Sequence, residues 1–190
     1  MTESVSNPPA SAGSTVTGTD LQRTRRHKTN GHAQSAVVDR LPPHSVEAEK
    51  GVLGCQLLSP NECVGEVIEK LKEDGVNAHY DLRHQVIQKE LFEMFNARLP
   101  IDLITIQQRL KDKQLLEQIG GIVYLSQLQD SVPSSANLGY YLQIVREKYL
   151  LRRLIQTCTG VVGRIYDFEG DVEQLLDEVE KDILHVNESR

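Results

Sequence analysis

Tryptophan is missing from this sequence, and six tyrosines and three phenylalanines make up only 5% of its 190 residues. Cysteine is scarce: Cys55, Cys63 and Cys158 are an odd number, and no two of them form a C-x-x-C pair. This pattern argues against a disulfide framework or a zinc ribbon and favours a reducing, cytoplasmic compartment. No segment approaches the roughly 20 uninterrupted apolar residues of a membrane span, and the polar N-terminus lacks a signal peptide's apolar core. We therefore expect a soluble intracellular protein without membrane association.

Motifs of nucleotide and metal chemistry are missing too. No G-x-x-x-x-G-K-[ST] phosphate-binding loop occurs, so ATP hydrolysis is not expected of these residues. His44, His79 and His84 do not have the spacing of a metal-binding pair, no carboxylate motif joins them, and structural roles are favoured over ligation. The cysteines are interpreted as small core residues rather than nucleophiles. We predict no catalytic residue, no metal ligand and no cofactor in this chain.

Charge is divided unevenly along the chain. Residues 1–40 carry five basic and three acidic residues, a net charge of +2, so the total of −6 leaves −8 for the other 150 residues. A DNA-binding domain normally presents a basic face that displaces counterions. Little or no direct DNA binding is therefore expected of residues 41–190, and proteins are the more plausible partners.

The first 40 residues are rich in serine and threonine and contain no aromatic residue. Such a segment cannot bury enough apolar surface to offset its ordering entropy, so residues 1–40 are predicted to be a disordered basic tail. The basic tract Arg23–Lys28 is interpreted as solvated, with contacts to phosphates or to an acidic partner as the alternative.

From Leu41 onward the sequence has a helical pattern, and 150 residues are enough for one domain with its own core. Apolar residues recur at three- and four-residue spacing, and no alternation typical of strands occurs. The predicted helix-capping residues are Ser45, Ser59, Asp81 and Asp102. The signal at Ser59 is the strongest, because Pro60 suits the first helical position and Glu62 completes a capping box. The expected fold class is all-α, with a compact helical head over residues 41–136.

A long αα-hairpin is expected over residues 137–190. Its first arm runs for about 30 residues from Asn137 to Tyr166, and its second arm begins at Asp171. One stripe of the first arm has heptad spacing, interrupted once by a lysine, and this spacing indicates an oligomerisation seam. The seam residues are Ile144, Leu151, Ile155, Cys158, Val162 and Ile165 on the first arm and Leu175, Leu176, Val179 and Ile183 on the second.

The first arm is apolar on more than one face, since it also carries Leu142, Val145, Leu150, Leu154 and Val161. The shorter second arm cannot cover all of these side chains. Either a second copy of the hairpin or the chain's own head must bury the remainder. Both remain open for the first half of the arm, and a second copy is favoured near the hairpin tip.

Five segments of residues 41–190 form a recognisable series. They are LPPHSVEAE (Leu41–Glu49) followed by VLG (Val52–Gly54), LPIDLITI (Leu99–Ile106), GGIVYL (Gly120–Leu125), PSSAN (Pro133–Asn137), and IVREK (Ile144–Lys148) leading to LRRL (Leu151–Leu154). In this order they resemble the N-terminal domain of bacterial replicative DNA helicases of the DnaB type. That resemblance implies a head of about six helices and a protruding hairpin.

The same resemblance implies a non-catalytic assembly and recruitment role. In that family two domains pair through their hairpins, three dimers form a collar on a hexameric helicase, and the collar recruits primase and, in some systems, a helicase loader. ATP and Mg belong to a motor domain that follows a linker, whereas this sequence ends at Arg190, where the second arm should end. The alternative is a free-standing regulator that joins the collar or sequesters primase without a motor.

Candidate partner-binding residues lie where the hairpin leaves the head. Aromatic and arginine side chains dominate interface energies, and Tyr140, Tyr141, Arg146 and Glu147 lie close to the Pro133–Asn137 turn. The resemblance implies that their partner is the C-terminal domain of primase. Structural packing of the tyrosines is the alternative, and packing is also favoured over stacking of single-stranded DNA on these aromatic residues.

Overall fold

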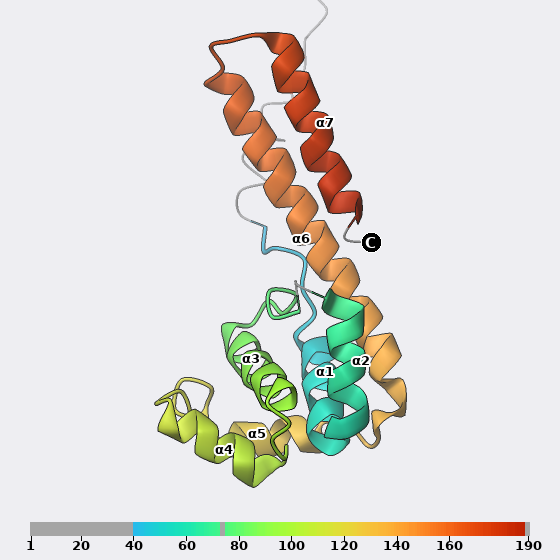
Figure 1. Ribbon diagram of the computed structural model, residues 1–190, viewed down its shortest axis with the longest axis vertical. Coiled ribbons are helices and arrows are strands. Elements are labelled where there is room, and N and C mark those ends of the chain that lie inside the picture. Colours follow the sequence, from blue (N-terminus) through green and yellow to red (C-terminus); the bar gives the residue numbers. More distant parts are fainter. Residues whose placement is uncertain (1–39, 73–74, 189–190) are drawn as a thin grey trace, which may run out of the picture. The chain divides into compact units, whose positions relative to one another are not determined.

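The structure is a computed structural model and describes residues 40–72 and 75–188 (Figure 1). All regular secondary structure in these residues is helical, which confirms the predicted all-α class. None of the helices in this part of the chain combines the length and the apolar character that a membrane crossing requires. The predicted disordered tail, including Arg23–Lys28, lies outside the described residues except for Arg40.

The head consists of short helices followed by the start of a long one. Its helices are α1 (Val46–Leu58), α2 (Pro60–Leu71), α3 (Leu82–Asn96), α4 (Leu103–Asp112), α5 (Gly121–Asp130) and the 3-10 helix η2 (Ser135–Asn137). The long helix α6 (Leu138–Tyr166) begins beside α1 and α2, and α7 (Val172–Glu188) returns along its distal half (Figure 1).

Three of the four predicted caps are present. The side chain of Ser45 accepts from the Ala48 N–H, Asp81 accepts from the Arg83 N–H, and Asp102 forms a reciprocal capping box with Thr105.

Ser59 is the N-cap residue of α2 and Pro60 is its first residue, as predicted, but the predicted capping box is wrong because the Ser59 side chain makes no capping hydrogen bond. The N–H of Ser59 donates to the Cys55 carbonyl, while its own carbonyl accepts from the Cys63 N–H at 3.0 Å. Ser59 thus closes α1 and opens α2 at once, with φ of −135° and ψ of 68°.

Helix α1 is buried on both sides and divides the core into two clusters. One joins it to α2 and to the beginning of α6 and contains Ala48, Val52, Cys55, Cys63, Val67, Leu71, Ala78, Val132, Leu138, Leu142 and Val145. The other joins it to α3, α4 and α5 and contains Leu53, Leu57, Ile87, Leu91, Met94, Ile106, Leu110, Ile119, Leu125 and Leu128. A helix that contributes apolar side chains on two faces is expected at the centre of a domain.

Two glycines of α1 allow its neighbours to approach. A Cβ atom on Gly51 would lie 2.7 Å from a ring carbon of Tyr141 in α6, and one on Gly54 would lie 2.4 Å from the Leu128 carbonyl oxygen in α5. Both glycines of this Gly51-x-x-Gly54 pair therefore permit close helix contact. The second such pair, Gly160 and Gly163, has nothing within 4 Å of an added Cβ among the described residues.

The structure also corrects the prediction for one cysteine. Cys55 and Cys63 are buried as predicted, and burial raises the pKa of the Cys55 thiol to about 11 and also raises that of Cys63. Cys158 was expected in a core but is exposed. It lies on α6 beyond the last turns that the head covers, so neither the head nor α7 buries it.

Replacing Gly54 by Ala tests the packing of α1 against α5. Because the obstructing atom is a backbone carbonyl, α5 has to shift, and we expect Gly54→Ala to lower the free energy of unfolding by about 1–3 kcal/mol. The matched control is Gly139→Ala in α6, where the nearest contact is Glu66 Oε1 at 4.0 Å. It should stabilise the protein by roughly 0.5–1 kcal/mol, because it removes a helical glycine. Urea denaturation measures the free energy of unfolding of both variants, and equal changes in Gly54→Ala and Gly139→Ala would contradict the close packing of α1 against α5.

Candidate interaction surface

The distal part of the hairpin exposes many large apolar side chains. The hairpin stripe comprises Leu151, Leu154, Ile155, Val162, Ile165, Val172, Leu176, Ile183 and Leu184, all of them exposed. Isolated exposed apolar residues are normal on a protein surface, but a group following one pair of helices marks an interaction site. This stripe is the largest feature of α6 and α7 that their own contacts do not explain.

An open groove of about 670 Å³ lies within this stripe, between α6 and the C-terminal part of α7. It is lined by Glu147, Leu150, Leu151, Leu154, Ile183, Leu184 and Val186. Only the first of these side chains is charged. The groove can therefore receive apolar side chains and has little to offer a polar ligand.

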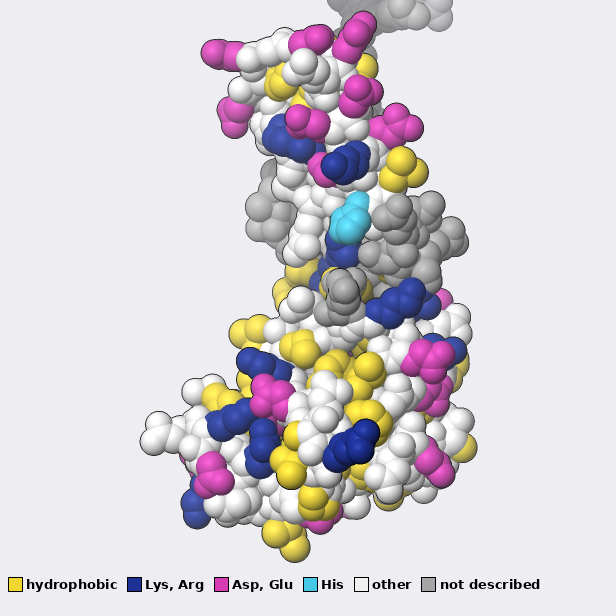
Figure 2. Space-filling model, in the orientation of Figure 1, with side chains coloured by type: hydrophobic (Ala, Val, Ile, Leu, Met, Phe, Trp, Pro, Cys, Tyr) yellow, Lys and Arg dark blue, Asp and Glu magenta, His cyan; other side chains and the backbone are white. Residues whose placement is uncertain are grey.

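The hairpin tip has the opposite character. Asp167, Glu169, Asp171 and Glu173 are exposed there, and Figure 2 shows the acidic side chains gathered at this end. Farther along, Arg164 of α6 pairs with Glu178 and Asp182 of α7. These ion pairs fix the two arms against each other, while the acidic tip is unsuited to a nucleic-acid contact.

The predicted seam residues do not all lie on one surface. Leu151, Ile155, Cys158, Val162, Ile165, Leu176 and Ile183 are exposed, while Ile144 and Val179 are half-buried. Leu175 is only 8% exposed and is buried in the hairpin. Ile144 packs against the α1–α2–α6 cluster of the head.

The head covers the beginning of the first arm of the hairpin, α6. Leu142 and Val145 are buried in the core of the head, whereas Leu154 is exposed. Beyond the first two turns or so of α6, the described part of the chain leaves the apolar faces largely open.

At the base of the hairpin, the candidate partner-binding residues differ in exposure. Tyr140 is 66% exposed and Glu147 is exposed, with Glu147 accepting a hydrogen bond from Gln143. Tyr141 is half-buried, because its ring fills the space beside Gly51. Arg146 is half-buried. Tyr140 is thus the aromatic side chain here that a partner can reach without any repacking.

Arg152 connects the hairpin to the head. Its guanidinium donates to the Pro43 carbonyl at 2.9 Å and to the Ala78 carbonyl at 2.6 Å. It also lies 5.7 Å from the ring centroids of Tyr80 and Tyr149. One side chain of α6 therefore binds both the segment before α1 and the segment before α3, which sets the direction in which the hairpin leaves the head.

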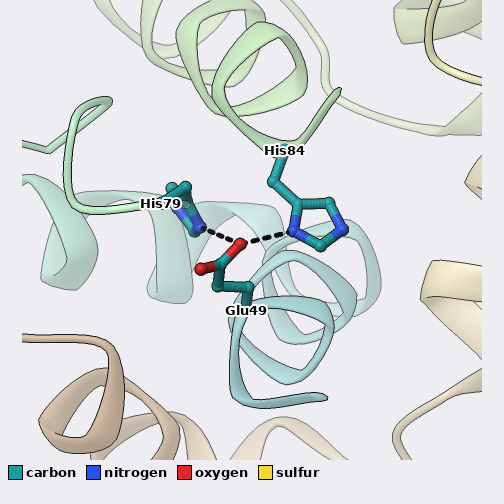
Figure 3. A group of neighbouring side chains, drawn as sticks. All are labelled: Glu49, His79 and His84. Atoms are coloured by element: carbon teal, nitrogen blue, oxygen red, sulfur yellow. Dashed lines mark hydrogen bonds and ion pairs between the residues drawn. The ribbon is translucent and has the colours of Figure 1, made fainter. Parts of the chain in front are cut away.

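The segment whose Ala78 carbonyl binds Arg152 continues into a buried polar cluster of Glu49, His79 and His84 (Figure 3). Glu49 accepts from the Tyr80 N–H at 2.7 Å and from His84 Nδ1 at 2.7 Å. Burial acts to raise the pKa of Glu49, but the hydrogen bonds from His84 and Tyr80 outweigh it and hold that pKa below its usual range. This carboxylate therefore stays ionised in the interior of the head.

Comparison with known proteins supports this architecture. The family model described as the DnaB-like helicase N-terminal domain matches residues 41–147. The chain belongs to this family. The crystal structure of the N-terminal domain of DnaB helicase from Mycobacterium tuberculosis is similar, with a TM-score of 0.69 and 35% identity over 76% of this chain and 99% of that chain.

Curated relatives of this DnaB-type domain are replicative DNA helicases. The chain is 40% identical over 148 residues to replicative DNA helicase DnaC of Bacillus subtilis, covering 78% of this chain and 32% of the relative. It is 40% identical over 164 residues to replicative DNA helicase DnaB of Rhodothermus marinus, covering 86% of this chain and 17% of the relative. The chain thus spans a third or less of the length of these two relatives.

Two features of this DnaB-type domain, the polar cluster around Glu49 and the contacts of Arg152, were not predicted from the sequence. Structural roles were predicted for His79 and His84, but no carboxylate was predicted beside them, which is wrong because Glu49 contacts His84 and lies 3.9 Å from His79. Glu49 lies 30 positions before His79 and 35 before His84, so spacing alone could not reveal the cluster. The contacts of Arg152 with the head were not predicted either, although the LRRL segment that contains it is one of those that resemble the family.

Substitution of Arg152 tests the joint between head and hairpin. Arg152→Met leaves two half-buried carbonyls without their charged donor, and we expect a loss of about 2–4 kcal/mol in the free energy of unfolding. Arg152→Lys should recover only part of this, because an ammonium cannot span both acceptors as the planar guanidinium does. Lys111→Met, at an exposed position of α4, is the control and should change stability by less than about 0.5 kcal/mol. Thermal or urea unfolding measures the stability of each variant. An Arg152→Met variant as stable as the unaltered chain would contradict the role of Arg152 in joining the hairpin to the head.

Proposed function

We propose that this chain is a non-catalytic assembly and recruitment domain of a replicative DNA helicase. In this proposal two copies pair through their hairpins, three such dimers form a hexameric collar, and the collar binds the C-terminal domain of primase and, in some systems, a helicase loader. The domain works in the cytoplasm, binds little or no DNA through residues 41–190, and uses no ATP or Mg of its own. Family membership supports the helicase context.

The hairpin stripe is the observation that carries the proposal. Neither the head nor α7 covers these side chains, and the groove between α6 and α7 is almost wholly apolar. A second hairpin supplies the same kind of surface and has the length needed to cover it, as expected for a symmetric interface or a four-helix bundle. A free-standing regulator would use the same surface. A reading frame that continues past codon 190 into a Walker A motif would decide for the helicase domain.

Self-association through the stripe has a direct test. Sedimentation velocity at micromolar concentration should show a dimer or a larger species for the unaltered chain. Ile155→Asp and Val162→Asp should shift it toward monomer, because an unpaired carboxylate buried at the interface costs several kcal/mol. Gln174→Asp, an exposed position of α7 outside the stripe, is the matched control and should leave the oligomer intact. A chain that remains monomeric at high concentration would contradict the collar.

Primase recruitment is tested with Tyr140. Calorimetric titration of the unaltered chain with the C-terminal domain of its cognate primase should show binding at tens of micromolar or tighter. Tyr140→Ala should weaken that binding about tenfold or more while the oligomer persists, as for a single aromatic anchor of an interface.

Tyr166→Ala serves as the control for this experiment, since this tyrosine is 82% exposed at the far end of α6. It should bind primase like the unaltered chain. The monomeric Ile155→Asp variant should also bind more weakly, because the collar brings neighbouring domains together. If the titration shows no binding heat although the oligomer is correctly assembled, primase is not the partner. Equal losses of primase affinity in Tyr140→Ala and Tyr166→Ala would contradict the role of Tyr140.

A further inference from the structure

Three side chains from separate parts of the head converge at one point in its interior (Figure 3). Glu49 comes from α1, His79 from the segment before α3, and His84 from the first turn of α3. Each is at most 1% exposed, and each offers one ligand atom within 4.8 Å of the others. Two imidazoles and one carboxylate are a ligand set that zinc and related divalent ions use in proteins.

The hydrogen bonds around His79 determine which of its nitrogens carries the proton. Gln56 Nε2 donates to the Val52 carbonyl at 3.3 Å, which fixes the orientation of its amide. The amides of Gln56 and Gln88 then pair reciprocally, with both contacts at 2.8 Å, so that Gln88 presents its oxygen to His79 Nε2 at 3.0 Å. His79 must therefore donate from Nε2.

The other nitrogen of His79 points into the cluster. Nδ1 is buried and has no hydrogen-bond partner within residues 40–72 and 75–188, and the nearest acid, Glu49 Oε2, lies 3.9 Å away. Because His79 donates its proton from Nε2 to Gln88, the Nδ1 atom of the uncharged ring carries a lone pair, and this lone pair faces Glu49 Oε2. Two electron-rich atoms that face each other in a protein interior require a cation between them or carry an uncompensated cost.

His84 can adapt to such a cation. Its Nδ1 lies 2.7 Å from Glu49 Oε2, and its Nε2 lies 2.7 Å from the Tyr124 hydroxyl. A hydroxyl both donates and accepts, so the His84 proton can occupy Nε2, donating to Tyr124, and leave Nδ1 free as a ligand. Each histidine then makes the outer hydrogen bond that metal-ligating imidazoles normally make, one to an amide oxygen and one to a hydroxyl.

We propose that Glu49, His79 and His84 form a structural binding site for a divalent transition-metal ion of the zinc class. The three side chains would supply three of the four ligands of a tetrahedral ion, with a water molecule as the fourth, and bonds of about 2.0–2.1 Å would place ligand atoms roughly 3.3–3.4 Å apart. The separations of Glu49 Oε2 from the two Nδ1 atoms, 2.7 Å and 3.9 Å, lie on either side of that value. Binding of the ion would therefore require the His84 ring to move away from Glu49 and the His79 ring to move toward it.

The position of the site indicates a structural role for the ion. The ion would tie α1 to α3 and to the segment before it, which includes Ala78, whose carbonyl receives Arg152. It would thus stabilise both the centre of the head and the joint that directs the hairpin. Full burial of the ligands leaves no access for a substrate, so the ion is structural and not catalytic.

The test begins with the full chain stripped by a chelator and transferred to metal-free buffer. Added Zn²⁺ should bind at one equivalent per chain, measured by mass spectrometry of the metal after gel filtration. It should raise the melting temperature by about 5–10 °C at a free concentration a hundredfold above the dissociation constant. Co²⁺ should give the visible absorption bands of a four-coordinate nitrogen and oxygen site.

His79→Gln is the decisive variant, because glutamine keeps a donor near Gln88 but removes the Nδ1 ligand. With its helical circular dichroism preserved, it should lose the bound equivalent and the thermal shift, whereas His185→Gln, at an exposed position of α7, should retain both. If His79→Gln does not fold, the Co²⁺ bands of the unaltered chain decide the matter. The proposal is overturned if the stripped chain takes up no metal and shows no such bands, or if a folded His79→Gln binds as well as the unaltered chain.

Discussion

Burial of α1 on both sides is the constraint from which the rest of the domain follows. Gly51 and Gly54 let Tyr141 of α6 and the backbone of α5 approach within van der Waals contact, so one helix serves two core clusters. The same burial encloses Glu49, whose charge requires donors. The N–H groups of Tyr80 and Asp81 and the imidazole of His84 supply them, and they thereby fix the segment before α3.

That segment in turn determines how the hairpin is attached. The Ala78 and Pro43 carbonyls receive Arg152, whose guanidinium lies near the rings of Tyr80 and Tyr149. The head uses only the first turns of α6 for its core, through Leu138, Leu142 and Val145, and leaves the remainder to α7 and solvent. A rigidly attached hairpin with an open apolar stripe is suited to assembly, because its direction is set before a partner arrives.

Much of this fold was predictable from the sequence, because local signals and structure agree. Ser45, Asp81 and Asp102 cap their helices as their positions indicate, and the two long arms follow their apolar periodicity. The failures arose where a residue's role depends on distant partners. Heptad spacing did not distinguish Leu175, which is buried in the hairpin, from the exposed Leu176, and Cys158 was assigned to a core that the described chain does not provide. The cluster depends on Glu49, which lies at least 30 positions from both histidines, and no local sequence pattern records that distance.

Whether the hairpin stripe faces a second copy of the chain can be measured directly with the cysteines that the chain already contains. Cys158 is exposed on α6 between the stripe residues Ile155 and Val162, whereas Cys55 and Cys63 are buried with raised pKa values and should resist modification in the folded protein. A nitroxide label on Cys158 of the unaltered sequence therefore reports on one site per chain. Pulsed electron spin resonance at micromolar concentration should show one defined distance between labels on different chains, and this signal should disappear on dilution with unlabelled protein. A signal with no intermolecular component, from protein shown to be folded, would contradict the pairing of two chains through the hairpin stripe.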